Sequence, residues 1–294
     1  MITEIAPARE RESVAPQQPR KVRRAWDEVP RWQIYLPLGI YLVFTLIPFY
    51  WILLFAFRPA GSTSLVPWPM TLDHFQKVWT ERSFGVYFQN SVYVGVATLI
   101  LTTVVALAGG YALARFEFKV KRAFMLALLC SQFVPGALLL VPLFQIFAKL
   151  QMINSLGSVI LAETVFQLPL SMILISGFIR NVPQSLEEAA WVDGCNRFAA
   201  FRIVVLPLLR PGLIAVGSFA FVHAWNHFLF ALMFLSDQSK QTIPVGLNTL
   251  MSADSVDLGA LAAGGIVAAI PVVIVFAFIQ KWLITGFSAG AVKG

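Results

Sequence analysis

The sequence predicts an all-α, polytopic membrane protein with six transmembrane helices. Hydrophobic residues make up 58% of its 294 residues, charged residues only 13%, and the mean hydropathy is +0.74. A soluble domain is nearer a quarter charged. The chain also contains six apolar stretches of the roughly 20 residues needed to cross ~30 Å of hydrocarbon. In a soluble protein the net charge of +7 would favour a nucleic-acid partner. In a membrane protein it indicates basic cytoplasmic loops, so we expect a lipid bilayer and no nucleic acid.

The six predicted segments follow one another with short connections. They are 34–57, 88–114, 123–147, 156–179, 208–235 and 258–284. Several contain proline, which membrane helices tolerate as kinks. Small residues recur four apart in two of them, at Ala106/Gly110, Ala108/Ala112 and Ala260/Gly264. This spacing indicates close helix–helix packing.

Polar segments flank the transmembrane domain, which we place at residues 31–287. Residues 1–30 are rich in Glu, Arg, Pro and Gln and lack the apolar core of a signal peptide, so we expect a disordered tail. Residues 288–294 form a second, short tail. The two cysteines, Cys130 and Cys195, are too few for a disulfide framework or a Cys-based metal site.

Lysine and arginine are distributed unequally between the connections. With the N-terminus inside, the cytoplasmic segments carry 17 of the 22 basic residues, and the opposite segments carry the other five. Because basic residues concentrate on the cytoplasmic side, we expect both termini in the cytoplasm. Residues 181–207 are then a cytoplasmic loop between the fourth and fifth segments.

This loop contains the signals of a short helix. Ser185 followed by Glu188 is a capping-box pattern, which predicts a helix from residue 186. Gly194 suits its C-terminal end, and Asn196 is expected to cap a second helix that reaches Val205. A helix of about eight residues is marginal alone in water. It therefore needs a surface to pack on, either the cytoplasmic face of this chain or a partner.

The same loop carries a longer motif, whose residues are Glu188, Ala189, Ala190, Gly194, Val204, Leu206 and Pro207. It resembles the EAA signature of binding-protein-dependent ABC importer permeases, and it lies where that family has it, before the penultimate span. Residues 224–231 and 288–294 are similar to the carbohydrate-uptake branch, the maltose-type permeases. The resemblance covers about residues 30–294. It departs at His227, where those permeases usually have an acid.

The resemblance implies a fold, a function and partners. The fold is that of a type I importer permease in the bacterial cytoplasmic membrane. The chain would pair with a second, related permease, with two ATPase subunits that bind ATP and Mg, and with an extracytoplasmic solute-binding protein. The EAA helix would fit the ATPase subunit through Glu187, Glu188, Ala189, Ala190, Asp193, Gly194, Leu206 and Pro207. The tail residues Gly290, Ala291, Val292, Lys293 and Gly294 would reach between the ATPase subunits.

No enzyme chemistry is evident in the sequence. It contains no Gly-Lys dipeptide, so the phosphate-binding loop of an ATPase is absent and we expect neither catalytic residues nor a cofactor in this chain. His223 and His227 lie four apart, but no third ligand accompanies them, so we expect no metal site.

Candidate residues for the solute path are Glu163, Gln167, Trp225, Asn226 and His227. An ionisable residue inside a membrane span is a functional candidate by default. For Glu163 the alternative is contact with water or a partner subunit near the outer end of its span. For His227 it is a structural hydrogen bond, and for Trp225 an anchor at the membrane interface.

Two other classes of protein remain as alternatives. An ion-gradient-driven secondary transporter usually has charges near the midplane or paired repeats, and neither is evident. An intramembrane enzyme would need a catalytic set. We therefore expect an ABC importer permease for a di- or oligosaccharide, a polyol or a glycerol-phosphate ester, and the sequence does not distinguish between these solutes.

Overall fold

The structure is a computed structural model that describes residues 30–81, 83–251 and 256–291, with only the backbone described for residues 282–291. The chain divides into two units, residues 1–49 and 50–294. The described part of the first unit is the beginning of helix α1 (Arg31–Phe57), which contains Pro37 and Pro48. The predicted disordered tail lies almost wholly outside the described residues.

Every regular element in the described part of the second unit is helical. After α1 these are α2 (Asp73–Glu81), α3 (Phe84–Arg115), α4 (Lys121–Ser131), α5 (Gly136–Lys149), α6 (Leu156–Arg180), α7 (Gln184–Val192), α8 (Arg197–Ala200), a π-helical turn (Phe201–Val205), α9 (Leu206–Leu208), α10 (Arg210–Asn226), α11 (Leu229–Phe234), a 3₁₀ turn (Gln238–Lys240), α12 (Ile243–Met251) and α13 (Leu258–Ala291).

Four of these helices are long and apolar enough to cross a membrane without interruption, and two bent pairs bring the number of candidate spans to at most six. The four are α1, α3, α6 and α13. Two of the six predicted segments, 123–147 and 208–235, are interrupted in the structure.

The first correction concerns the predicted helix 123–147. Helices α4 and α5 meet at 102°, and the break ends at Pro135, whose backbone is extended. Because proline has no N–H group and disfavours helical geometry in the residue before it, α4 ends and a new helix begins.

The second correction concerns the predicted helix 208–235. Helix α10 ends at Asn226, His227 is extended, and α11 starts at Leu229. At its other end α10 is bent by 74° from the segment 197–208.

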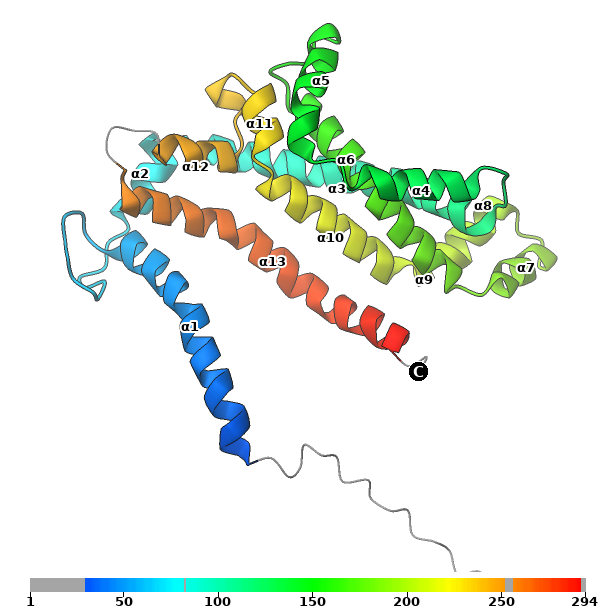
Figure 1. Ribbon diagram of the computed structural model, residues 1–294, viewed down its shortest axis with the longest axis horizontal. Helices are drawn as coiled ribbons and strands as arrows, with labels where there is room; N and C mark the ends of the chain where they lie inside the picture. The colour runs from blue at the N-terminus through cyan, green and yellow to red at the C-terminus, as the bar shows by residue number, and fades with distance from the viewer. Residues whose placement is uncertain (1–29, 82, 252–255, 292–294) are drawn as a thin grey trace, which may run out of the picture. The chain divides into compact units, whose positions relative to one another are not determined.

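The bundle is organised around α3, which packs against α6 and α10, while α10 also packs against α13 (Figure 1). The small residues on α3 permit this contact. A Cβ atom on Gly110 would lie 2.7 Å from Ile175 Cγ2 on α6, and Ala106 is fully buried. The predicted close packing is confirmed for this pair, but Ala108 is exposed and lies on another face.

Helices α7, α8 and α9 lie at one end of α3, and α2 and α12 lie toward the other (Figure 1). A core cluster of α3, α6 and α10 residues extends to the first end through Ile179, Val182 and Val205. The predicted loop 181–207 is therefore built onto the end of the packed bundle.

Candidate functional site

Helix α7 contains the EAA segment and starts earlier than predicted. It spans Gln184–Val192, and its N-cap is Pro183, without a side-chain cap. The predicted capping box is wrong because Ser185 lies inside the first turn, where it cannot act as the cap. The extended backbone of Pro183 starts the helix instead.

The end of α7 is confirmed. Gly194 has φ +88°, a left-handed conformation that glycine adopts without a Cβ penalty. Its N–H donates to Trp191 O at 3.0 Å, and the N–H of Cys195 donates to Ala190 O at 2.9 Å. These hydrogen bonds satisfy carbonyl groups of the last turn, and the chain reverses.

The second helix of the loop is also confirmed at its start. Asn196 accepts a hydrogen bond from the N–H of Ala199 at 2.8 Å. The helix then widens to a π-helical turn at Phe201–Val205 and continues to Leu208. The π turn was not predicted. Pro207 indicates an irregular helix at this place, because its ring crowds the carbonyl four residues earlier.

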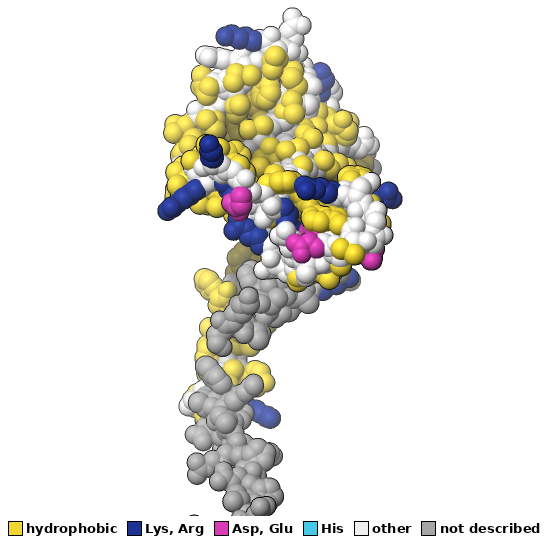
Figure 2. All heavy atoms as spheres, turned by 90° about the vertical axis from the view of Figure 1, so that its right-hand side faces the viewer, with side chains coloured by type: hydrophobic (Ala, Val, Ile, Leu, Met, Phe, Trp, Pro, Cys, Tyr) yellow, Lys and Arg dark blue, Asp and Glu magenta, His cyan; other side chains and the backbone are white. Residues whose placement is uncertain are grey.

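One face of the loop projects apolar side chains outward. Leu186, Val192 and Phe198 are 43%, 88% and 73% exposed. Figure 2 views this end of the bundle and shows apolar, acidic and basic side chains at the surface together. Of the predicted coupling residues, Ala190 and Leu206 are half-buried. The exposed ones are Glu188, Ala189, Asp193, Gly194 and Pro207. Val192 and Phe198 were not predicted, although their apolar type in a cytoplasmic loop is a usable signal.

Glu187 occupies the opposite face of α7. It is 2% exposed, and its carboxylate accepts hydrogen bonds from Arg115 Nε at 2.6 Å and Tyr111 Oη at 2.8 Å. Its predicted role as a direct contact of a partner is therefore corrected: the carboxylate is directed into the bundle, because the end of α3 supplies two donors there.

A second buried acid lies inside the bundle. Glu163 on α6 is fully buried, and one of its oxygens lies 3.0 Å from His223 Nδ1 on α10. The other lies 2.6 Å from Nδ1 of His227, just beyond the end of α10, but with an alignment outside that of a hydrogen bond. Glu163 thus faces histidines of the same chain, neither water nor an open path.

The two histidine rings are stacked at 5.2 Å and 19°, and Phe166 and Phe230 flank them. Among the described residues no group of three or more His, Cys, Asp or Glu side chains has the arrangement of a metal site. At position 227, where the permeases that this chain resembles usually have an acid, the histidine lies beside the Glu163 carboxylate of α6.

The remaining path candidates separate into buried and exposed residues. Trp225 is 2% exposed and Gln167 is 8% exposed. The Trp225 indole donates to Ala268 O at 3.0 Å and so joins α10 to α13, and its burial makes the interface-anchor alternative wrong. Asn226 alone is well exposed. Both residues border a cavity of about 380 Å³, together with Asn248, Leu247 and Met251.

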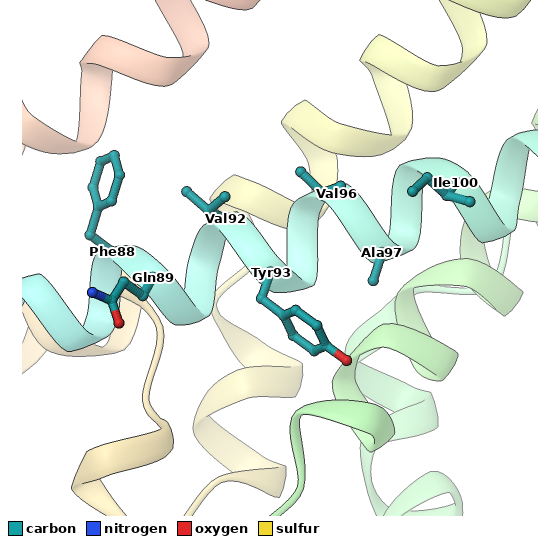
Figure 3. Close-up of a pocket in the computed structure, with 7 residues that line it drawn as sticks. All are labelled: Phe88, Gln89, Val92, Tyr93, Val96, Ala97 and Ile100. Atoms are coloured by element: carbon teal, nitrogen blue, oxygen red, sulfur yellow. The ribbon is translucent and has the colours of Figure 1, made fainter.

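A larger, shallow groove of about 540 Å³ runs along α3 (Figure 3). Its lining comes from α3 alone: Phe88, Gln89, Val92, Tyr93, Val96, Ala97 and Ile100. Tyr93 and Ile100 are 60% and 55% exposed. A groove with walls from one helix and a single amide does not enclose a polar solute.

A bundle of helices that are apolar enough to cross a membrane, with a short helix projecting from one end, defines a helical integral membrane protein. The chain belongs to the family of binding-protein-dependent transport system inner membrane components, whose sequence profile matches residues 105–288. The resemblance drawn from the EAA signature is confirmed. The protein is thus a multi-pass inner-membrane permease and a transport component, not an enzyme.

Individual relatives support this membership. The chain is 36% identical to the diacetylchitobiose uptake system permease protein DasC of Streptomyces coelicolor, over 92% of this chain and 98% of that protein. It is 31% identical to the arabinooligosaccharides transport system permease protein AraQ of Halalkalibacterium halodurans, over 93% of this chain and all of that protein. A crystal structure of a bacterial ABC transporter involved in the import of the acidic polysaccharide alginate has a chain with the same fold, with a TM-score of 0.72 at 19% identity, covering 86% of this chain and 98% of that one.

Membership in this family implies an ATPase and a binding protein as partners. The described part of the chain, by contrast, supplies the helical bundle and the projecting loop.

Proposed function

We propose that this protein imports a carbohydrate, either a sugar or an oligosaccharide. ATP hydrolysis on partner subunits drives the change between its inward- and outward-facing states, and α7 transmits the movement. The observation that carries the proposal is the exposed face of α7 and α8, with Val192 and Phe198 projecting beside the Gly194 turn. Relatives at 31% and 36% identity that are named for oligosaccharide and diacetylchitobiose uptake support the solute class.

Coupling of ATP hydrolysis to transport requires a surface that the ATPase subunit can bind and that moves as a rigid body. Helix α7 is held at both ends, by Pro183 and by the hydrogen bonds around Gly194. Exposed apolar side chains such as Val192 are costly in water and become favourable when a partner buries them. The ATPase groove is the partner that we assign to this face, with Glu188 and Asp193 at its polar edge.

The assembly that we propose contains a second, related permease, two ATPase subunits and an extracytoplasmic solute-binding protein. The basic residues favour cytoplasmic termini and a cytoplasmic α7. The apolar groove on α3 is the face that we assign to the second permease, because a protein surface can fill a groove that lipid chains only cover. Of the tail residues Gly290 to Gly294, the last three lie outside the described residues, and their contact with the ATPase subunits remains part of the proposal.

For the solute path we retain Trp225 and Asn226, which border the same cavity, and withdraw Glu163 and Gln167. The Asn226 cavity presents amide groups beside apolar walls, and carbohydrate hydroxyls hydrogen-bond to such groups. The buried Glu163 is instead a polar joint between α6 and α10.

That buried acid also favours one alternative, an ion-gradient-driven transporter, because ionisable groups inside the membrane mark proton paths. Reconstitution separates the two. Proteoliposomes that contain both permeases, the ATPase and the binding protein are given labelled diacetylchitobiose or arabinooligosaccharide. We expect uptake that needs ATP on the ATPase side and persists when an ionophore collapses the proton gradient. Uptake that continues without ATP and stops with the ionophore would establish the alternative.

A further inference from the structure

Helix α7 is attached to the bundle by a buried acid. Within α7, which is described in full, Glu187 is the one residue that is buried. Its neighbours Leu186 and Glu188 are exposed. A helix of nine residues has little stability of its own, so its position depends on the few side chains that reach back to the bundle.

Both oxygens of the Glu187 carboxylate are used. Oε1 accepts from Arg115 Nε at 2.6 Å and Oε2 accepts from Tyr111 Oη at 2.8 Å. The two donors are four residues apart, so they lie on one face of α3 in its last turns. Charge-assisted hydrogen bonds are shorter and stronger than neutral ones, and a carboxylate removed from water depends on them.

Arg115 makes a second connection. Its Nη2 donates to Val182 O at 2.9 Å, in the link between α6 and α7. Arg115 is the last residue of α3, and its side chain is 10% exposed. One guanidinium therefore holds the start of the loop and the first turn of α7 against the same end of α3.

Tyr111 extends the contact to the other side of the loop. Its ring packs edge-on against Phe201 of the π-helical turn, with centroids 5.0 Å apart. Along the chain, the loop residues that follow α7 connect it to α10. The contacts of Glu187 add a connection to α3, which is 72 residues away in sequence and is the helix around which α6 and α10 pack.

We propose that Tyr111, Arg115 and Glu187 form a clamp that makes α7 and α3 move as one body, so that force on the loop reaches the bundle through α3. They are positioning residues, and this role rests on the proposed coupling of α7 to an ATPase. Of the two acids in the EAA segment, Glu188 faces outward and Glu187 holds the helix in place.

The test uses the assembled transporter with its ATPase and binding protein. Cys130 and Cys195 are replaced by alanine, and spin labels are placed at the exposed Glu117, just beyond α3, and at Ser185 on α7. The separation of the labels is measured in the nucleotide-free and vanadate-trapped complexes, together with ATP hydrolysis. The clamp variants are Glu187→Gln and Tyr111→Phe, and the matched control is Arg122→Gln, an exposed basic residue at the same end.

We expect one narrow separation in both states of the unmodified and control proteins. In the clamp variants the complex still assembles and hydrolyses ATP, but the separation broadens and shifts several ångströms on trapping. A narrow, unchanged separation in both variants would overturn the clamp. So would loss of the assembled complex in Tyr111→Phe, since the cluster would then be required for folding. If the unmodified chain does not bind the ATPase at all, the proposed function fails, independently of the clamp.

Discussion

Glu163 and His227 lie 2.6 Å apart inside the helical bundle, although they come from α6 and from the break after α10. His223 contacts the other oxygen of the same carboxylate. A fully buried carboxylate is costly unless neighbouring groups compensate its charge. His223 makes the hydrogen bond to this carboxylate, at 3.0 Å, and the contact ties α6 to α10.

Replacing Glu163 therefore tests this joint. Glu163→Ala removes the hydrogen-bond partner of His223, and we expect a loss of about 1–3 kcal/mol of stability from the buried group left without a partner. The measurement is the thermal midpoint of the detergent-solubilised complex. Glu117→Gln, which removes an exposed ion pair with Lys121, is the control. Equal midpoints for Glu163→Ala and the control would contradict the joint.

Residue 194 has a left-handed backbone conformation that favours glycine. A Cβ atom there would meet no atom within 4 Å, but φ is +88°, so Gly194→Ala is expected to cost about 1–2 kcal/mol locally through strain. Gly194→Pro adds the loss of an N–H that donates to Trp191 O. We expect both variants to insert in the membrane and to lose ATP-driven uptake, with proline the more severe.

Gly177 is a matched control for this change. It lies within α6, it also has open space at its Cβ position, and its φ is not positive. Gly177→Ala should leave uptake unchanged. If Gly194→Ala does the same, the turn is not needed for coupling.

Val192 and Phe198 are expected to bind the ATPase directly. Since both are largely exposed in the free chain, Val192→Asp and Phe198→Ala should leave the fold intact. Truncation of buried interface residues costs about 1–2 kcal/mol or more, so co-purification with the ATPase should fall about tenfold or more. Leu65→Ala, at another exposed apolar residue (66% exposed), is the control. ATPase binding that does not change in either loop variant would rule out this surface.

Asn226 is expected to contact the solute. Asn226→Ala should raise the KM for uptake of the transported sugar, with a smaller effect on ATP hydrolysis, because it removes hydrogen-bonding groups from the cavity without altering α7. Gln89→Ala, in the groove on α3, should leave the KM unchanged. A KM that is the same in both variants would remove Asn226 from the path.

Asp257 lies outside the membrane spans and is expected to make the stability of the fold depend on pH. Burial raises the pKa of its carboxyl, but hydrogen bonds from Lys77 and from the N–H of Ala260, with the charges of Lys77 and His74, outweigh it and leave the pKa below its usual value. The stability from this pair is present above about pH 4, the usual pKa of aspartate, and is lost as the pH falls through the lower folded-state value. Lys77→Met should flatten the fall in thermal midpoint as the pH drops below about 4. The same fall in both proteins would exclude the pair as its source.

Local signals predicted the local features of the loop correctly. Gly194 and Asn196 act through hydrogen bonds to residues at most five positions away, so their own neighbourhood defines them. The capping box at Ser185 failed because Pro183 offers a competing start to the helix. Pro135 predicted a kink in the segment 123–147, but hydropathy measures only apolar length and does not give the size of the 102° bend between α4 and α5.

The class of protein follows from the sequence alone, through its apolar lengths, its basic loops and the EAA pattern, since membrane insertion responds to the composition of each segment separately. What each acid does, by contrast, depends on how the helices pack. Glu187 and Glu188 are adjacent in sequence, and Glu163 stands alone in its span. The roles of Glu187 and Glu163 depend on donors 60 to 76 residues away in sequence. A buried carboxylate is stable only where packing brings such donors to it.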